Sequence, residues 1–217
     1  MKIRRILARL AASCGLLLPP EGHVSKRQLL RLFWLARKSS GPFLEVGPWV
    51  GRSTSAIAWP LRNRRNPSKF ITIEKGFASL EDWENFWGIS VYAKPPKLAE
   101  RYTRHILRPG GSIASLSETL VDRGLGELVT IFVGDLLNFC STEQFRFIYC
   151  DAAHDLTEIK RNLPSLIPLI DRQNCIFVCD DIKNPAMCEA VLALLQPDAH
   201  RLYGDFFVAR FGAAVDA

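Results

Sequence analysis

The sequence predicts an α/β fold in which a mostly parallel, seven-stranded sheet carries helices on both faces and ends in an antiparallel hairpin. Two observations predict this class. From Pro42 onward, short apolar runs alternate with helical stretches, which is typical of a parallel sheet covered on both faces. The last two apolar runs are separated by Gly204-Asp205 alone, a connection that suits antiparallel neighbours. A chain of 217 residues fits one domain of this kind.

The expected elements follow one another from residue 25. Residues 25–38 gather leucines and Phe33 on one helical face, and Ser25 is a suitable N-cap. Strands are then expected at Phe43–Val46, Phe70–Ile73, Val129–Val133, Phe147–Cys150, Cys175–Cys179, Arg201–Tyr203 and Phe206–Arg210. Helices are expected at Ser53–Leu61, within Leu80–Asp122, at Leu156–Ile170 and at Met187–Leu195.

Charge divides the chain into an extension and a body. Residues 1–40 carry nine lysines and arginines against one glutamate, whereas residues 41–217 carry a slight acidic excess. We therefore expect a basic helical N-terminal extension over residues 1–40 and one domain over residues 41–217. Peripheral contact of the extension with an anionic membrane is one hypothesis for its role. The acidic body argues against a nucleic-acid substrate, because nucleic-acid enzymes spread a basic stripe over the folded domain.

Cysteine usage and the N-terminus bear on the cellular compartment. The six cysteines contain no C-x-x-C metal knuckle, and four of them lie in or beside apolar runs. Arg9 interrupts the apolar stretch near the N-terminus, and no clean small-residue cleavage motif follows it. We therefore expect free thiols and a cytoplasmic protein without a secretory leader.

The stretch Phe43 to Ala58, FLEVGPWVGRSTSAIA, passes from a strand through two glycines into a helix of small residues. Aligned on Gly47, the dinucleotide fingerprint G-x-G-x-x-G requires glycine where Trp49 and Arg52 stand. The P-loop pattern fails as well when it is aligned on Gly51. The turn is therefore a poor cradle for pyrophosphate or triphosphate, which disfavours a nicotinamide-dependent reductase. An ordinary tight turn between strand and helix is the alternative.

Two glutamates accompany this turn. Gly47 lets the chain turn tightly off the strand, and Gly51 removes a side chain where a ligand would approach. Glu45 suits a cationic group of a ligand. Glu74, at the end of the second strand, stands where such sheets bind the hydroxyl pair of a ribose. Together these residues favour a nucleoside ligand that carries an amino group.

On these motifs the chain resembles the class I S-adenosylmethionine-dependent methyltransferases, which have a Rossmann-like fold. The run from Glu45-Val46-Gly47 to Gly51-Arg52-Ser53-Thr54 is similar to the first motif of small-molecule and sugar O-methyltransferases. The resemblance covers roughly residues 43–210, and the last hairpin matches the family's antiparallel final strand. It implies S-adenosylmethionine as the cofactor. By the resemblance, its methionine end lies at Glu45, Gly47, Gly51 and Ser53, its ribose at Glu74 and its adenine near Asp135.

Three aspartates follow two strands that are expected to be neighbours. Asp151 follows the fourth strand in IYCDAAHD, and Asp180 and Asp181 follow the fifth in CIFVCDDI. Since the carboxyl ends of parallel strands face one crevice, these carboxylates crowd together unless a cation lies between them. Mg²⁺ prefers such ligands, and the metal-dependent catechol-type and macrolide-sugar-type enzymes carry acidic residues at these positions. We expect Asp151, Asp180 and Asp181 to bind Mg²⁺. The alternatives are capping by Asp180 or Asp181, and a methyltransferase without a metal.

The reaction that the resemblance implies is methyl transfer from a sulfonium to a hydroxyl oxygen of a small molecule or sugar. His154 is expected to take the hydroxyl proton, with Asp151 as the second catalytic residue. The catechol type has lysine at the position of His154, and DRQN replaces the family's Pro-Gly-Gly before the fifth strand. A structural role for His154 is therefore an alternative. A nucleoside-binding regulatory protein without turnover is the alternative function, and a homodimer is one candidate assembly.

Residues 75–126 are longer than a simple crossover between two strands requires. They include EDWENFWGISVYAKPPK, with Trp83 and Trp87 one helical turn apart. Two interpretations fit this insertion equally well. It is either a lid that binds the methyl acceptor or an extra helix that packs its aromatic side chains into the core.

Overall fold

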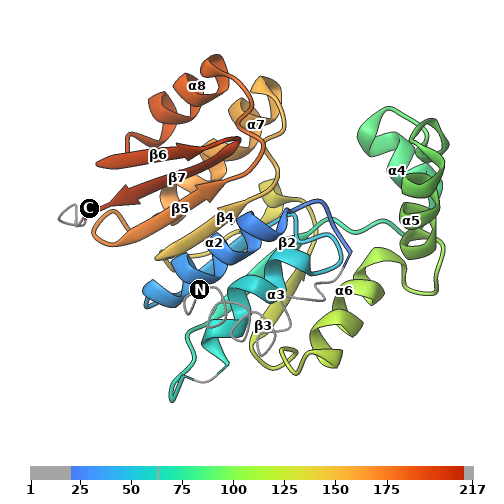
Figure 1. Ribbon diagram of the computed structural model, residues 1–217, viewed down its shortest axis with the longest axis horizontal. Coiled ribbons are helices and arrows are strands. Elements are labelled where there is room, and N and C mark those ends of the chain that lie inside the picture. The colour runs from blue at the N-terminus through green and yellow to red at the C-terminus, as the bar shows by residue number, and fades with distance from the viewer. Residues whose placement is uncertain (1–20, 63, 213–217) are drawn as a thin grey trace, which may run out of the picture.

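The computed structural model describes residues 21–62 and 64–212 and contains a seven-stranded sheet of order β3-β2-β1-β4-β5-β7-β6 (Figure 1). The strands are β1 (Phe43–Val46), β2 (Phe70–Glu74), β3 (Val129–Val133), β4 (Phe147–Cys150), β5 (Cys175–Cys179), β6 (Ala199–Tyr203) and β7 (Phe206–Phe211). Strands β1 to β5 are parallel, and β7 runs antiparallel to both β5 and β6. The predicted mostly parallel sheet with a C-terminal antiparallel hairpin is confirmed, and the strand ends differ by two residues at most.

Helices and short 3-10 turns connect the strands. The helices are α2 (Lys26–Lys38), α3 (Arg52–Ala58), α4 (Leu80–Trp87), α5 (Pro96–Ile106), α6 (Gly111–Asp122), α7 (Leu156–Leu166) and α8 (Pro185–Leu195). The 3-10 turns are η1 (Trp59–Leu61), η2 (Val91–Ala93), η3 (Leu136–Asn138) and η4 (Ile167–Leu169). The expected helices at Ser53–Leu61 and Leu156–Ile170 each contain an α-helix that tightens into a 3-10 turn, with a proline within each turn.

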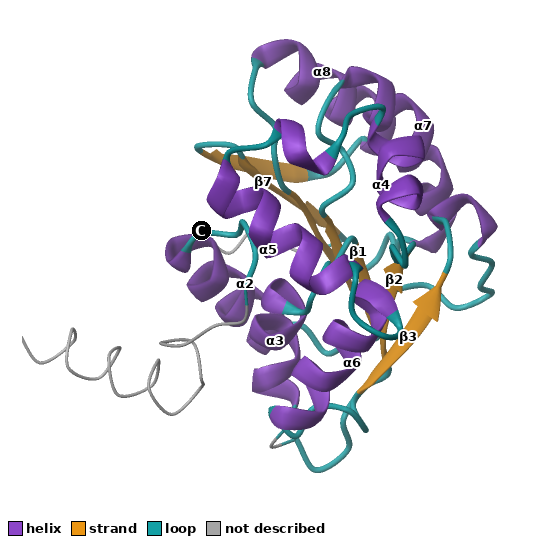
Figure 2. Cartoon of the chain, turned by 90° about the vertical axis from the view of Figure 1, so that its right-hand side faces the viewer, coloured by secondary structure: helices purple, strands orange, loops and turns teal. Residues whose placement is uncertain are grey.

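Strand residues alternate between two cores, one on each face of the sheet. On β1, Phe43 packs with α2, α3 and α6, whereas Leu44 packs with α7 and α8. Successive side chains of a strand point to opposite faces, so one continuous apolar run supplies both cores. Figures 1 and 2 show the sheet between these helical layers. The side chains that continue past the strand ends therefore emerge at the edge of the sheet.

Helix α2 begins where the sequence predicts. The Ser25 hydroxyl accepts a hydrogen bond from the Gln28 N–H at 3.3 Å, and the Gln28 side chain accepts one from the Ser25 N–H at 2.8 Å. This reciprocal pair is a capping box. The helix buries Leu29, Leu32, Phe33 and Ala36 in the core that contains Phe43. The part of the predicted extension that the structure describes thus covers the sheet, while residues 1–20 lie outside the described residues.

The long insertion contains two parts with different packing. Helix α6 places Leu116 and Leu120 in the main core and therefore serves as the ordinary crossover helix between β2 and β3. Helices α4 and α5 project beyond the sheet edge (Figure 1). They have a small core of their own, formed by Phe77, Trp83, Val91 and Ile106. The segment beyond the minimal fold is therefore the α4–α5 pair.

In residues 21–62 and 64–212, helices long and apolar enough to span a bilayer are absent. The five cysteines of this part of the chain are free thiols, and Cys14 lies outside it.

Candidate active site

A cavity of about 440 Å³ opens where β1, β2, β4 and β5 end. A volume of this order is typical of small-molecule sites. On one side lies a group of carboxylates that we call the acidic edge: Asp151, Glu158, Asp180, Asp181 and Asp205. On the other side lies the aromatic wall: Trp49, Phe77, Trp83, Phe86, Trp87 and Tyr102. Gly47, Glu74 and Asp135 line the cavity as well.

The two glycines of the first turn are required for different reasons. Gly47 lines the cavity at φ 82°, and a Cβ there would lie 2.4 Å from the carbonyl oxygen of Asp151. Gly47 therefore lets the first turn pack directly on the loop that carries Asp151. Gly51 has φ 92°, and a Cβ there would lie 3.1 Å from side-chain atoms of Leu116 and Thr119 on α6. The left-handed backbone and the packing of α6 thus explain Gly51, rather than the expected approach of a ligand.

Glu45 lies beneath the turn and is absent from the cavity lining, as is Ser53. Its side chain is fully buried, and its Oε2 accepts a hydrogen bond from the Thr72 hydroxyl at 3.0 Å. Burial raises the pKa of Glu45 to about 7, although the hydroxyls of Ser53, Thr54 and Thr72 act to lower it. Contact of Glu45, Gly51 and Ser53 with the cofactor stays a prediction. The structure places Glu45 beneath the first turn, where its side chain supports the turn from outside the cavity.

Glu74 lies in the cavity lining at the end of β2. Its Oε2 accepts the N–H of Trp49 at 2.9 Å, and its Oε1 accepts the N–H of Gly76 at 3.0 Å. Burial raises the pKa of Glu74 to about 7, against the lowering effect of these two N–H groups. Each carboxylate oxygen has a second lone pair, so the group retains acceptor capacity for a hydroxyl pair.

Asp135 lines the same cavity beyond the end of β3. Its Oδ1 accepts the N–H of Leu137 at 2.9 Å and starts the 3-10 turn η3. Its Oδ2 accepts a hydrogen bond from Arg161 at 2.9 Å. Asp135 is therefore held in a fixed orientation beside the expected adenine position.

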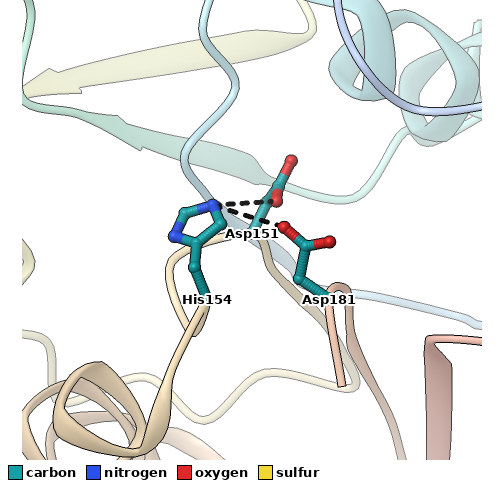
Figure 3. A group of neighbouring side chains, drawn as sticks. All are labelled: Asp151, His154 and Asp181. Atoms are coloured by element: carbon teal, nitrogen blue, oxygen red, sulfur yellow. Dashed lines mark ion pairs between the residues drawn. The ribbon is translucent and has the colours of Figure 1, made fainter. Parts of the chain in front are cut away.

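The three predicted metal ligands lie together at the acidic edge, in two overlapping groups. Potential ligand atoms lie within 4.8 Å of one another in the group Asp151, His154, Asp181 and in the group Asp180, Asp181, Asp205. Figure 3 shows the first group. Asp181 belongs to both, and its backbone is left-handed at φ 63°, a conformation that aspartate tolerates. The set of carboxylate oxygens with one imidazole nitrogen suits a hard divalent cation.

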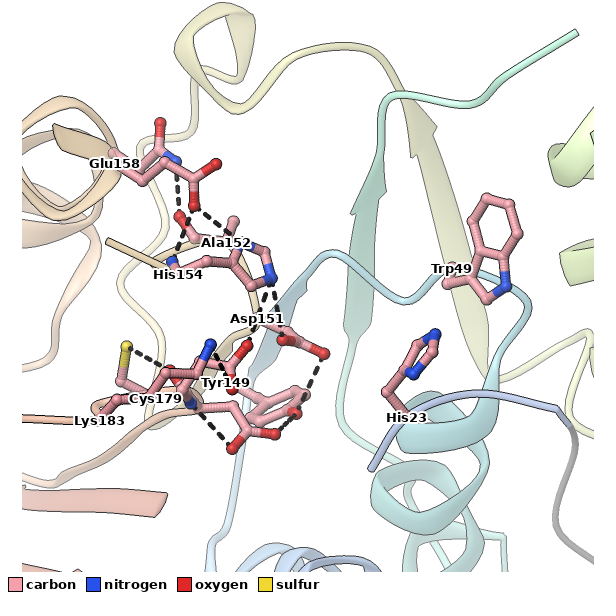
Figure 4. Close-up of polar contacts among 12 residues, drawn as sticks. His23, Trp49, Tyr149, Asp151, Ala152, His154, Glu158, Cys179 and Lys183 are labelled. Atoms are coloured by element: carbon pink, nitrogen blue, oxygen red, sulfur yellow. Dashed lines mark hydrogen bonds and ion pairs between the residues drawn. The ribbon is translucent and has the colours of Figure 1, made fainter. Parts of the chain in front are cut away.

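Burial and the crowding of like charges raise the pKa values of Asp151 and Asp180. Partial burial and the charge of Asp180 raise the pKa of Asp151 to about 8. Burial and the charges of Asp181 and Asp205 raise the pKa of Asp180 to about 6, although the hydrogen bond from the Asp181 N–H acts to lower it. The Tyr149 hydroxyl lies between two of the carboxylates, 3.4 Å from Asp151 Oδ2 and 3.2 Å from Asp180 Oδ2 (Figure 4). The O–H of Tyr149 is a hydrogen-bond donor to these carboxylates and so offsets part of the repulsion between them.

His154 faces three carboxylates. Its Nδ1 lies 2.7 Å from Glu158 Oε2, and its Nε2 lies 3.8 Å from both Asp151 and Asp181 (Figures 3 and 4). Burial would lower the pKa of His154, but the hydrogen bond to Glu158 and the surrounding negative charges raise it to about 9. The ring therefore holds its proton more strongly than a free imidazole does. To take a proton from the acceptor, His154 must first be neutral, which requires the neighbouring negative charges to be offset.

The aromatic wall connects the first turn with the insertion. The ring centroid of Trp83 lies 4.7 Å from that of Tyr102 and 6.1 Å from that of Trp49. Trp87 reaches the acidic edge, with its centroid 5.7 Å from that of His154. The indole Nε1 atoms of Trp49 and Trp83 are buried and lack a hydrogen-bond partner within the described part of the chain. The insertion thus forms a wall of the cavity and packs a small core of its own. Its expected role as a lid that binds the acceptor stays a prediction.

Sequence reasoning missed several residues of the site. Tyr149 stands two residues before Asp151, so strand periodicity could have indicated it. Glu158 stands in the first turn of α7, four residues after His154, which itself precedes the helix. Asp205 lies in the hairpin turn, and Gln28 lies on α2, with His23 just before that helix. These last three reach the cavity only because the chain folds back over it.

Comparisons with known proteins bear on the family and the fold. A family model described as a methyltransferase domain matches residues 44–182. No curated protein sequence matches the chain. Among solved structures, cofactor-bound Rv0187 from MTB is 19% identical with a TM-score of 0.55, and the alignment covers 96% of this chain and 90% of that one.

Two O-methyltransferases show a similar likeness. TomG from Streptomyces achromogenes, involved in tomaymycin synthesis and solved with SAM, is 18% identical with a TM-score of 0.53, covering 94% of this chain and 95% of that one. The Bacillus cereus O-methyltransferase solved with SAH is 15% identical with a TM-score of 0.54, covering 95% and 89%. At these identities the likeness concerns the fold, and the predicted Rossmann-like fold is confirmed.

Proposed function

Because the chain belongs to the class I S-adenosylmethionine-dependent methyltransferases, we propose that it methylates a hydroxyl oxygen of a small molecule or sugar. The observation that carries the proposal is a single cavity that joins Gly47 and Glu74 to the acidic edge. A nucleoside cofactor and a hydroxylated acceptor can therefore meet in one space. Holding two reactants in alignment contributes about 7–11 kcal/mol toward a barrier of this kind.

The cofactor side fits S-adenosylmethionine by the chemistry of its groups. The remaining lone pairs of Glu74 would accept the ribose hydroxyls, and Asp135 would lie beside the adenine. Gly47, which lines the cavity, would lie beside the methionine end, and Glu45 and Ser53 would support that turn from beneath. The cofactor supplies the methyl group on its sulfonium sulfur.

The acceptor side combines flat apolar surfaces with hard oxygen ligands. The aromatic wall offers ring faces for a planar acceptor or a sugar ring, and the unpaired Nε1 atoms of Trp49 and Trp83 would donate to its polar groups. Asp151, Asp180 and Asp181, with Asp205, would hold Mg²⁺. A divalent cation there would supply positive charge that lowers the pKa of an acceptor hydroxyl and offsets the aspartate charges.

His154 is the proposed proton acceptor, with Asp151 beside its ring. Glu158 fixes the ring through Nδ1, which leaves Nε2 directed to Asp151 and Asp181. Because its pKa is about 9 in the unliganded protein, His154 accepts a proton near neutral pH only after the negative charges are offset. The acidic edge and the base are therefore coupled in this proposal.

The first test is calorimetric titration of S-adenosylmethionine into the full-length protein. We expect micromolar binding. Glu74→Gln should weaken binding by about tenfold or more, since a hydrogen bond to a charged group contributes about 1.5–3 kcal/mol. Glu45→Gln is the matched control at the neighbouring strand, and we expect a change below about threefold, because Glu45 does not line the cavity.

Methyl transfer is then measured on a panel of aromatic and sugar hydroxyl acceptors, with Mg²⁺ and with a chelator. Product formation that the chelator abolishes would support the whole proposal. Product formation that survives the chelator would favour a metal-independent methyltransferase. Cofactor binding without any product would favour the nucleoside-binding alternative, and absence of cofactor binding would contradict the proposal.

A further inference from the structure

Gln28, in the first turn of α2, uses both ends of its side-chain amide. Its Oε1 accepts the N–H of Ser25 at 2.8 Å, which closes the capping box. Its Nε2 donates to Asp180 Oδ1 at 2.9 Å and lies 3.4 Å from Asp205 Oδ1. One side chain therefore joins the start of a helix to two carboxylates of the acidic edge.

The orientation of this amide follows from the chemistry of its neighbours. The Ser25 N–H is a donor, so the atom that faces it must be the amide oxygen. The amide nitrogen then faces Asp180, which is an acceptor when ionised. Reversing the amide would break both contacts. Gln28 thus presents a fixed N–H donor to the acidic edge.

The other contacts of Asp180 come from its own sheet layer. Its Oδ2 receives the hydroxyl of Tyr149 at 3.2 Å, and its Oδ1 receives the N–H of Asp181 at 3.0 Å. Gln28 approaches from another layer, 152 residues away in the sequence. It therefore restrains the carboxylate in a direction that the strands do not control.

The segment before α2 also lies along the cavity. His23 Nε2 lies 2.6 Å from the Tyr102 hydroxyl, and Glu21 Oε2 lies 2.9 Å from His105 Nε2. Both partners belong to α5 of the insertion. The chain from Glu21 to Gln28 therefore runs from the aromatic side of the cavity to the acidic edge, and Gln28 is its attachment to the acidic edge.

We propose that Gln28 is a positioning residue of the acidic edge, whose Nε2 holds the carboxylates of Asp180 and Asp205 in the orientation used by the acceptor site. This inference rests on the proposed function for the use of the site. Partners that orient ligands of a metal site typically contribute about 10–100-fold to metal affinity or activity. The competing explanation is that Gln28 only stabilises the start of α2.

Two variants of the full-length protein separate these explanations. Gln28→Met keeps a similar side-chain length but removes the donor to Asp180 together with the amide half of the capping box. Ser25→Ala removes the hydroxyl half of the same box and leaves the Gln28 amide in place. Both variants lose one capping contact, so the melting temperature should fall in each of them. Only Gln28→Met loses the contact with the acidic edge.

The readouts are crystal structures of wild type and both variants, calorimetry with Mg²⁺ alone and with S-adenosylmethionine alone, and kcat and KM for a responsive acceptor. We expect Gln28→Met to displace the Asp180 carboxylate, to weaken Mg²⁺ binding by about tenfold and to leave cofactor affinity unchanged. Ser25→Ala should preserve the position of Asp180 and the Mg²⁺ affinity.

An unmoved Asp180 carboxylate in the Gln28→Met crystal would overturn the proposal, as would equal Mg²⁺ affinities in the two variants when the wild type binds the ion. A wild type that binds neither Mg²⁺ nor the cofactor would instead refute the proposed function. In that case the crystallographic position of Asp180 still decides the role of Gln28.

Discussion

The acidic edge and the aromatic wall face each other across one cavity, yet the chain builds them in different ways. Most of the acidic edge comes from residues next to strand ends: Asp151 after β4, and Asp180 and Asp181 after β5. Most of the wall comes from the α4–α5 insertion and the segments beside it, with Trp49 added from the first turn. Sheet registry therefore positions the carboxylates, whereas side-chain packing within the insertion positions the aromatic rings.

This difference predicts which substitutions alter chemistry and which alter acceptor binding. The edge carries charge in a confined site, so its variants should change turnover. The wall offers apolar ring surface, so its variants should change the KM for the acceptor.

Asp151→Asn should lower methyl transfer by about 100-fold or more, because it removes from the reaction site a carboxylate that is proposed to bind Mg²⁺ beside His154. The change keeps the shape of the side chain, and the assay is initial rate with saturating cofactor. Asp155→Asn is the matched control four residues later, since Asp155 caps α7 and asparagine is an equally good N-cap. Equal losses in the two variants would show that the acidic edge is not the reaction site.

Trp87→Leu should raise the KM for the acceptor by roughly fivefold to tenfold and leave cofactor affinity unchanged, because an aromatic contact contributes about 0.5–1.5 kcal/mol beyond area burial. Trp87 is 39% exposed and lies beside Trp83 and His154. Trp34, which is 37% exposed on α2 and outside the cavity lining, is the control for loss of a tryptophan. An unchanged KM for the acceptor in Trp87→Leu would show that this part of the aromatic wall does not bind the acceptor.

Glu45→Gln tests whether the buried carboxyl beneath the cavity changes the free energy of unfolding with pH. The folded protein raises the pKa of Glu45 from 4.5 to about 7, so the native state binds its proton more tightly than the unfolded state does. Its contribution to stability is complete below pH 4.5 and is lost as the pH rises through about 7. The variant should therefore gain roughly 3 kcal/mol relative to wild type between pH 4.5 and pH 8.

Urea denaturation at several pH values between 4.5 and 8 measures this difference. Glu118→Gln is the control, because Glu118 is an exposed carboxylate that pairs with Arg108. If the difference in unfolding free energy between wild type and Glu45→Gln stays constant from pH 4.5 to pH 8, Glu45 titrates normally and is not a buried support of the turn.

Prediction from the sequence succeeded where local pattern and sheet topology coincide. The short apolar runs at Phe43–Val46 and Cys175–Cys179 have strand character throughout, and each is followed by polar residues that must emerge at the carboxyl edge. The Ser25 cap was likewise readable, because a capping box is local. Glu45 shows the limit of such reasoning. It stands one residue before the end of β1, and strand alternation directs its side chain beneath the turn, away from the cavity.

The α/β class, the order of the elements and the convergence of Asp151, Asp180 and Asp181 can be predicted from the amino-acid sequence, because these depend on apolar runs and on positions next to strand ends. The three-dimensional structure was needed to show that Gln28, His23 and Asp205 reach the same cavity and that the insertion forms its wall. Those contacts join residues as far as 177 positions apart, and their geometry depends on helix packing. Periodicity along the chain records which face of an element is buried, but it carries no information about which distant element will cover it.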